Sequence, residues 1–271
     1  AKEIVMYKYL LILILPAMLS IGCQTNPVTG KRELMLISKS QEEQIDAEYA
    51  PEIAKQLGGK IDSPELQKYV NSVGQKVASA SYTPNRNFTF AALNDKMVNA
   101  FALPGGTIYI TRGLLEILDS EAQLAAILAH EVSHVSTRDV SNAMSNQIGM
   151  NLVLSAAIPE DSPRAAVTAA NVGAKIISLG FSRSDEKQAD SGGLHYLVRA
   201  GYPPQAMAEV MQKLNEQSGQ RSIEFLSTHP NPENRIELIN EQIYRRAYPK
   251  DRDPKKEAFR KNVLNNLPET E

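Results

Sequence analysis

The stretch from Ser120 to Arg138, SEAQLAAILAHEVSHVSTR, decides the fold that we expect for this chain of 271 residues. Ser120 is a favourable N-cap, and Gln123 three residues later completes a capping-box pattern. The apolar residues that follow recur at helical spacing: Leu124, Ile127, Leu128 and Val132. The pattern predicts one amphipathic helix over 120–138 with one buried stripe.

Inside this helix lies an H-E-x-x-H motif, His130-Glu131-Val132-Ser133-His134. Two histidines four residues apart differ by about 40° around a helix, so both imidazoles can reach one metal ion. Glu131 is rotated by about 100° from His130, where a general base can take a proton from a water that the metal activates. Burying these polar groups in an alanine-rich segment without a partner is costly. The motif therefore favours a catalytic zinc site over a helix that merely carries two histidines on a partly polar face.

A second helix is predicted from residue 183, capped by Ser182 with Asp185 three residues later, to the turn at 201–204. Glu186 and Asp190 are four residues apart and share a face of it. Two such acids usually face water. A zinc held by two histidines needs a third protein ligand, however, and a downstream carboxylate is a common solution. We predict that Glu186 is this ligand and that Asp190 orients a ligating histidine by a hydrogen bond.

His229 precedes a further predicted helix, which Asn231 caps and Pro232 begins. A histidine in a loop is usually a solvated surface residue. In this chain it can instead donate to the oxyanion of a tetrahedral intermediate, or close the fourth zinc position in a resting state. Arg235 either pairs with a nearby carboxylate or lies on the surface. His195 is interpreted as a helix-face residue without a catalytic role.

Three strands are predicted over 88–93, 98–103 and 107–111, and they suggest a small antiparallel sheet beside the metal helix. Within the second strand lie Asn99, Ala100, Phe101 and Ala102. They form either a plain hairpin strand or an edge that receives a peptide substrate as an added strand. The sequence over 142–179 predicts two helices. They form either a cover over the cleft at the metal helix or a helical hairpin that belongs to the core.

The N-terminal segment resembles a processed leader. An apolar run over 9–19 has the length of a signal-peptide core and is too short for a stable membrane span. Cys23, the sole cysteine, follows small residues, as at a bacterial lipidation site, although Leu19 stands four residues before it instead of three. The alternative is an ordinary secretory signal with an incidental thiol. We expect a signal peptide over 1–22 and a lipid-anchored linker over 23–37.

The remaining chain suits one globular domain over 38–247, with two further helices at 38–57 and 63–80. The net charge of −2 gives no reason to expect nucleic acid as a partner. Residues 248–271 are charged and contain several prolines, so they predict a solvated tail with one short helix.

Four motifs in this order resemble those of the M48 zinc metallopeptidases, and most closely the periplasmic, lipoprotein-type bacterial members. They are the NAFALPGG stretch from Asn99, His130-Glu131-x-x-His134, Ser182-Arg183-x-x-Glu186-x-x-Ala189-Asp190, and Thr228-His229-Pro230 with Arg235. The resemblance covers residues 26–246, including an Asn-Pro-Val-Thr-Gly segment at 26–30.

The resemblance implies a mostly helical α+β, gluzincin-like fold with one zinc ion per chain, held by His130, His134 and Glu186, with Glu131 as general base. In some relatives the histidine that matches His229 occupies the metal in a latent state. The resemblance also implies quality control of misfolded or stalled membrane proteins in the cell envelope.

We therefore expect a zinc endopeptidase of the bacterial periplasm, anchored by lipid to a membrane, with the outer membrane favoured. Its expected partners are the membrane and unfolded or misassembled proteins. One alternative is a metal-stabilised chaperone or assembly factor with little or latent proteolysis. A second is a metallohydrolase that acts on a non-peptide substrate.

Overall fold

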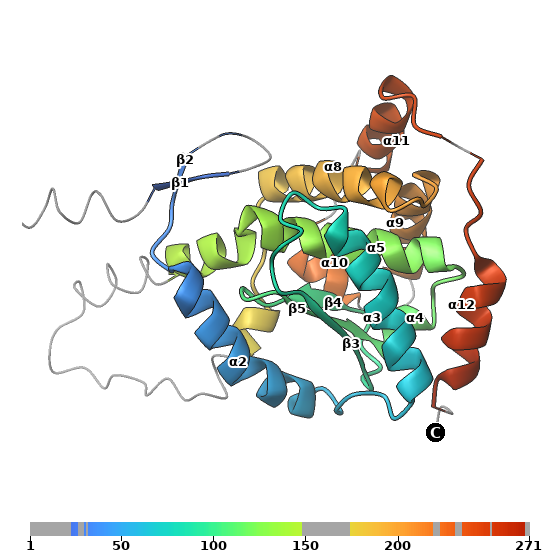
Figure 1. Cartoon of the computed structure of the whole chain (residues 1–271), viewed down its shortest axis with the longest axis horizontal. Coiled ribbons are helices and arrows are strands. Elements are labelled where there is room, and N and C mark those ends of the chain that lie inside the picture. The colour runs from blue at the N-terminus through green and yellow to red at the C-terminus, as the bar shows by residue number, and fades with distance from the viewer. Residues whose placement is uncertain are drawn as a thin grey trace, which may run out of the picture.

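The computed structural model describes residues 23–26, 30, 32–147, 174–218, 223–230, 235–249 and 251–268. The predicted signal peptide and most of the predicted helical hairpin at 142–179 lie outside these residues. The fold is α+β and mostly helical, as predicted, with α5 (Glu121–Thr137) at its centre (Figure 1). The other helices are α2 (Lys39–Gln56), α3 (Pro64–Ser79), α4 (Arg112–Leu115), α8 (Arg183–Arg199), α9 (Gln205–Ser218), α10 (Glu224–Thr228), α11 (Arg235–Arg245) and α12 (Lys256–Asn262), followed by the 3-10 helix η1 (Leu264–Asn266).

Serine caps begin four of these helices, including the two that are predicted to begin at Ser120 and Ser182. Each serine hydroxyl accepts a hydrogen bond from the backbone N–H three residues later. The capping box is complete at α2 and α8. At α5 the Gln123 side chain instead accepts from the backbone N–H of Asp119, one residue before the cap. The caps are Ser38, Ser63, Ser120 and Ser182.

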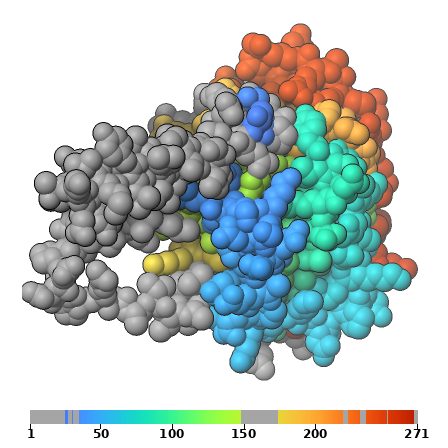
Figure 2. Space-filling view, turned by 60° about the vertical axis from the view of Figure 1, so that its left-hand side comes forward, coloured from blue at the N-terminus to red at the C-terminus, as the bar shows by residue number. Residues whose placement is uncertain are grey.

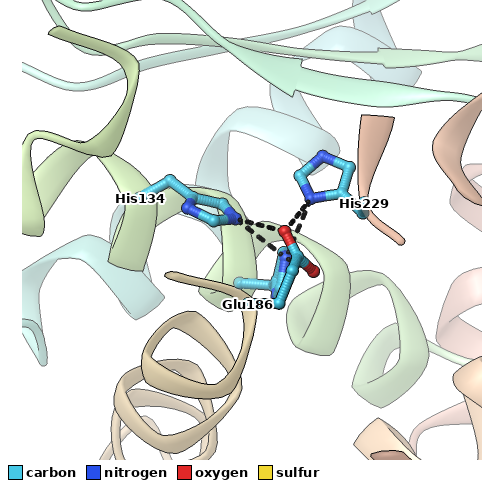
Figure 3. A group of neighbouring side chains, drawn as sticks. His134, Glu186 and His229 are labelled. Atoms are coloured by element: carbon cyan, nitrogen blue, oxygen red, sulfur yellow. Dashed lines mark hydrogen bonds and ion pairs between the residues drawn. The ribbon is translucent and has the colours of Figure 1, made fainter. Parts of the chain in front are cut away.

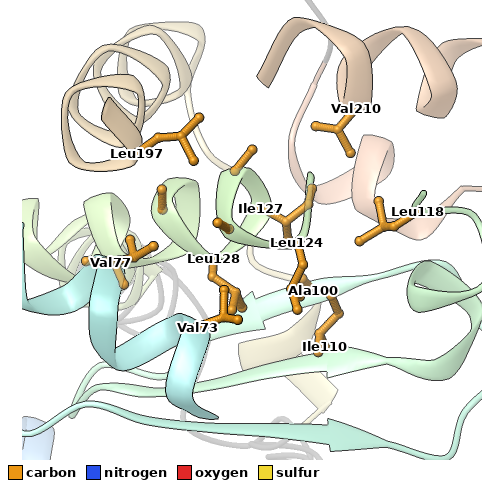
Figure 4. Close-up of a cluster of buried hydrophobic side chains, with 14 of the residues drawn as sticks. Val73, Val77, Ala100, Ile110, Leu118, Leu124, Ile127, Leu128, Leu197 and Val210 are labelled. Carbon is orange, nitrogen blue, oxygen red and sulfur yellow. The ribbon is translucent and has the colours of Figure 1, made fainter. Parts of the chain in front are cut away.

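Helix α5 is buried on every side, so the prediction of a single buried stripe is wrong. All its residues are buried, including the polar ones. The sheet and α3 lie on one side of α5, and α8 and α9 lie on the other (Figure 4). Helix α8 approaches closely because Gly193 has no side chain: a Cβ there would lie 3.0 Å from the backbone of Ala129. The small alanines of α5 allow neighbours to pack all around it.

The sheet contains β3 (Thr89–Leu93), β4 (Ala100–Ala102) and β5 (Thr107–Thr111) in the order β3-β5-β4. β4 and β5 form the predicted antiparallel hairpin, but β3 runs parallel to β5. The sheet is therefore mixed, and the prediction of an antiparallel sheet is wrong for this pair. The connection between β3 and β4 crosses the end of β5, where the backbone N–H of Gly113 donates to the carbonyl of Asp95 at 2.9 Å. This crossing places β4 on the far side of β5.

The two faces of the sheet contact different helices. Ala100, Ile108 and Ile110 belong to the main core with α3 and α5. Phe101 and Tyr109 point to the opposite face, where they join a second apolar cluster with α2. Helix α2 forms much of the blue surface in Figure 2. The sheet is thus enclosed between α2 and the central helix.

A short antiparallel ribbon lies within the predicted linker, formed by β1 (Cys23–Thr25) and β2 (Arg32–Leu34). The backbone of Cys23 lies opposite that of Leu34. Within the described ranges, none of the helices combines the length and the apolar character that crossing a bilayer requires. Lipidation at Cys23 stays a prediction.

The C-terminal segment packs on the domain, so the prediction of a solvated tail is wrong for residues 251–268. The predicted short helix is present as α12. Its Phe259, and Val263 just after it, are fully buried in the main core. The carbonyl of Pro254 accepts from the first turn of α5 at 3.1 Å, and Lys255 Nζ lies 2.7 Å from the Glu121 carboxylate. A few buried apolar residues and one ion pair thus attach a segment whose overall composition is charged.

Candidate metal centre

The histidines of the H-E-x-x-H motif point to one place from successive turns of α5. The Nε2 atoms of His130 and His134 lie 3.1 Å apart. Both side chains are fully buried, and their rings meet edge to face with centroids 4.7 Å apart. The helical spacing of the motif therefore brings the two nitrogens together as predicted.

Two further donors arrive from other elements (Figure 3). Glu186, in the first turn of α8, places Oε1 3.3 Å from His134 Nε2 and Oε2 3.5 Å from His130 Nε2. His229, directly after α10, places Nδ1 3.2 Å from His130 Nε2 and 2.9 Å from Glu186 Oε1. One donor atom from each of the four residues lies within 4.8 Å of the others, and all four residues are buried.

The donor atoms fit a zinc ion in spacing and in chemistry. Two ligands about 2.0–2.1 Å from zinc at a tetrahedral angle are separated by about 3.3 Å, and the observed separations run from 2.9 to 3.5 Å. His130 and His134 each direct Nδ1 toward a carboxylate, which places the ring proton on Nδ1. Two Nε2 lone pairs then face each other at 3.1 Å, an arrangement that a cation between them stabilises.

Carboxylates and one arginine surround the four donors. Asp190 Oδ1 lies 3.0 Å from His130 Nδ1, the position predicted for it. Arg235 is buried and donates to both oxygens of Asp190, at 2.6 and 2.7 Å, and its Nη1 lies 3.0 Å from Glu186 Oε2. Of the two readings open for Arg235, the structure shows carboxylate pairing. It also places Asp139, which the sequence analysis missed, with Oδ2 2.8 Å from His134 Nδ1.

Glu131 lies beside the donors and binds none of them directly. Neither of its carboxylate oxygens has a hydrogen-bond partner among the described residues, and the residue is 1% exposed. Its Oε1 lies 3.7 Å from His229 Nε2. Burial raises the pKa of Glu131 to about 7. A carboxylate with this pKa and no fixed partner can both accept and release a proton near neutral pH.

Two aromatic rings enclose the centre. Phe181 stacks on His134 with centroids 4.1 Å apart, and Phe225 stacks on His229 at 4.4 Å. The backbone N–H of Phe181 donates to the carbonyl of Thr228 at 3.2 Å, which links the segment just before α8 to the residue before His229. His195 lies outside the centre, stacked against Tyr82.

The predicted substrate edge lies at the side of the sheet near α5. Within the described part of the chain, β4 pairs on one side only, with β5. Asn99 is fully buried just before β4, and neither atom of its side-chain amide has a hydrogen-bond partner there. Ala100, Phe101 and Ala102 are also buried. The structure therefore contains the strand edge, with its side chains covered.

Comparison with known proteins agrees with this geometry. Residues 64–243 match the model described as Peptidase family M48. This chain belongs to that family. M48 peptidases use zinc, and the cluster of His130, His134, Glu186 and His229 offers donors for one ion.

Several named relatives are similar over most of this chain. The beta-barrel assembly-enhancing protease of Escherichia coli K12 is 33% identical over 230 residues, which cover 79% of this chain and 46% of that protein. The mitochondrial metalloendopeptidase OMA1 of Arabidopsis thaliana is 28% identical over 213 residues, 78% of this chain and 42% of that protein. OMA1 of Schizosaccharomyces pombe is 27% identical over 223 residues, 80% of this chain and 65% of that protein. The chain spans about half the length of the first of these relatives.

Proposed function

We propose that this chain is a zinc-dependent endopeptidase of the bacterial cell envelope that cleaves unfolded or misassembled proteins. The observation that carries the proposal is Glu131, a buried carboxylate without a partner, next to three convergent donors in His130, His134 and Glu186. A buried charged group without a hydrogen bond is costly. A proton-transfer role explains why this chain keeps one there.

The proposed chemistry is general acid–base catalysis beside a metal. When bound, zinc supplies Lewis acidity, which polarises the scissile carbonyl and lowers the pKa of water. Glu131 accepts the proton of the attacking water and passes it to the leaving amine. Asp190 keeps the ring proton of His130 on Nδ1, so that its Nε2 atom stays available.

His229 gives this centre a closed state. Four protein donors are typical of structural zinc sites, whereas catalytic sites leave one position open. We therefore assign this conformation to a latent enzyme in which His229 would be the fourth protein donor to a bound zinc ion. The hydrogen bond between the Phe181 N–H and the Thr228 carbonyl links the segment before α8 to the residue before His229. Once displaced, His229 is available to donate to the oxyanion of the reacting carbonyl.

The edge of β4 is the proposed substrate position. An added peptide strand bonds through its backbone, which gives affinity with little dependence on the substrate's side chains. That property suits an enzyme for unfolded proteins. The buried Asn99 amide, without a partner in the described chain, supplies one further donor and acceptor next to this edge.

The proposed location is the periplasm, with a lipid at Cys23 that attaches the chain to a membrane, the outer membrane being favoured. The support is the apolar leader before the cysteine and the similarity to a protein named for beta-barrel assembly. A rival proposal is a metal-stabilised chaperone or assembly factor, and the closed centre with His229 in place favours it.

The test compares three variants of purified residues 24–271. Glu131→Gln keeps all proposed ligands, so we expect about one zinc per chain and cleavage of an unfolded protein slowed by about 10²–10⁴-fold. His134→Ala removes a ligand, so we expect loss of zinc. His229→Ala is expected to retain zinc and change the cleavage rate. Unchanged cleavage by Glu131→Gln would show that the base is assigned wrongly, and rescue of an envelope phenotype by this variant would favour the chaperone.

A further inference from the structure

The backbone changes direction directly after the metal helix. α5 ends at Thr137, and Arg138 adopts a left-handed conformation with φ 64° and ψ 28°. Helical geometry resumes over 139–147. A left-handed conformation costs a residue with a side chain about 1–2 kcal/mol, and such costs persist where the surrounding structure imposes them. Arg138 therefore marks a place where the fold holds the backbone in an unfavourable geometry.

This change of direction decides where Asp139 points. In a continuous helix, a residue five positions after His134 lies about 140° around the axis from it, so its side chain points away. The break at Arg138 instead brings Asp139 Oδ2 to 2.8 Å from His134 Nδ1. Asp139 is 3% exposed and His134 is fully buried. The left-handed backbone at Arg138 thus turns Asp139 toward His134, so that the two side chains form a hydrogen bond.

A buried ion pair holds the break in place. Arg138 Nε lies 2.6 Å from Glu42 Oε1, and Arg138 Nη2 donates to the carbonyl of Ile37 at 2.6 Å. Glu42 is fully buried on α2, where it also accepts from Ser141 and lies 2.8 Å from Arg86. Charge-assisted hydrogen bonds of this length are among the stronger contacts in a protein interior. They offset the backbone cost at Arg138.

Each of the two ligating histidines therefore has its own carboxylate partner, and the two carboxylates come from different parts of the chain. Asp190 on α8 accepts from His130, and Asp139 accepts from His134. Asp190 accepts from Arg235 at both of its oxygens, and its Oδ1 also accepts from His130. Asp139, in contrast, forms its ion pair within the described ranges with His134. Such a carboxylate fixes the tautomer and ring angle of a metal-binding histidine.

We propose that Asp139 is a positioning residue for the metal ligand His134, and that the Glu42–Arg138 pair places it there through the left-handed backbone at Arg138. This inference deepens the proposed metal site and rests on it. Asp139 acts through His134 and does not touch the reacting groups.

The test measures zinc affinity by competition with a chromophoric chelator, in wild type, Asp139→Asn and Glu121→Gln. Glu121 is the matched control, a buried carboxylate at the start of α5 that accepts hydrogen bonds away from the metal centre. We expect Asp139→Asn to raise the zinc dissociation constant by about 10–100-fold and to shift the visible bands of the cobalt-loaded protein. Glu121→Gln is expected to leave both unchanged while it lowers the melting temperature.

A second measurement uses wild-type protein, so it does not depend on how a variant folds. In the zinc-loaded protein, nitrogen-edited NMR of the four histidines is expected to show a proton on His134 Nδ1, shifted downfield and slow to exchange. An affinity for Asp139→Asn within about twofold of wild type, or a His134 Nδ1 without its proton, would overturn the inference. Wild type that binds no zinc would instead refute the proposed metal site itself.

Discussion

Replacing Arg235 with methionine removes the guanidinium that lies between two buried carboxylates. Arg235 is 2% exposed, donates to both oxygens of Asp190 and lies 3.0 Å from Glu186. Removing one partner of a buried ion pair costs about 3–5 kcal/mol, because the remaining charge stays buried and uncompensated. In a domain of this size each kcal/mol shifts the melting temperature by about 2–4 °C. We therefore expect Arg235→Met to melt about 6–20 °C below wild type when the metal is chelated.

Bound zinc should reduce this fall in melting temperature, because a cation at the four donors compensates the negative charge of Glu186. The assay is thermal unfolding followed by circular dichroism, with and without a chelator. Arg245→Met is the matched control on the same helix. Arg245 is 74% exposed on its side chain and pairs with Glu241 at 2.6 Å, and exposed pairs of this kind contribute about 0–1 kcal/mol. If the two variants melt at the same temperature, Arg235 does not compensate the buried carboxylates as we argue.

Three further predictions concern stability. Phe259→Ala empties a fully buried position on α12, so we expect the free energy of unfolding, measured by chemical denaturation, to fall by about 3–5 kcal/mol. Tyr244 is 79% exposed, so the control variant Tyr244→Ala should change this free energy little. Burial raises the pKa of Glu121, but hydrogen bonds from Lys255 and two tyrosines outweigh burial and hold this pKa below its usual range. These hydrogen bonds therefore stabilise the fold above about pH 4.3, the pKa of Glu in an unfolded chain, and their stabilisation is lost as the pH falls through the lower pKa of the folded state. The difference of about 1–3 kcal/mol in unfolding free energy between wild type and Glu121→Gln at pH 7 should disappear in acid, and a difference that does not change with pH would contradict this. Chelation should lower the melting temperature by about 8–16 °C, since metal at a thousand times its dissociation constant stabilises by about 4 kcal/mol, and an unchanged melting temperature would show that the folded chain does not bind the ion.

The donors of the metal centre were predictable because their signals are local. His130 and His134 are fixed by helical spacing, and Glu186 and Asp190 share one face of a capped helix. His229 was a weaker prediction, since three interpretations of it were open: a surface residue, a donor to the oxyanion and a fourth zinc ligand. The structure brings all four donors together. The roles assigned to these residues remain proposals that the variants above test.

Asp139 could not be predicted as a partner of His134, because a regular helix puts it on the wrong side. Its position depends on the conformation of Arg138, which in turn depends on Glu42, almost a hundred residues earlier. Contacts of this range have no periodic signature in the sequence.

Two other differences have similar causes. The order of the three strands depends on the path between β3 and β4, whereas alternation of apolar residues reports only that a strand is present. The docking of the C-terminal segment rests on Phe259 and Val263, two residues among many charges. The average composition of the segment does not reveal these two residues.

The most direct test of the central claim is cleavage of an unfolded protein by purified residues 24–271, with zinc measured in the same sample. We predict about one zinc per chain and cleavage that a chelator stops, with a faster rate if His229→Ala opens a latent centre. A chain that binds no zinc, or that cleaves equally well after chelation, would contradict it.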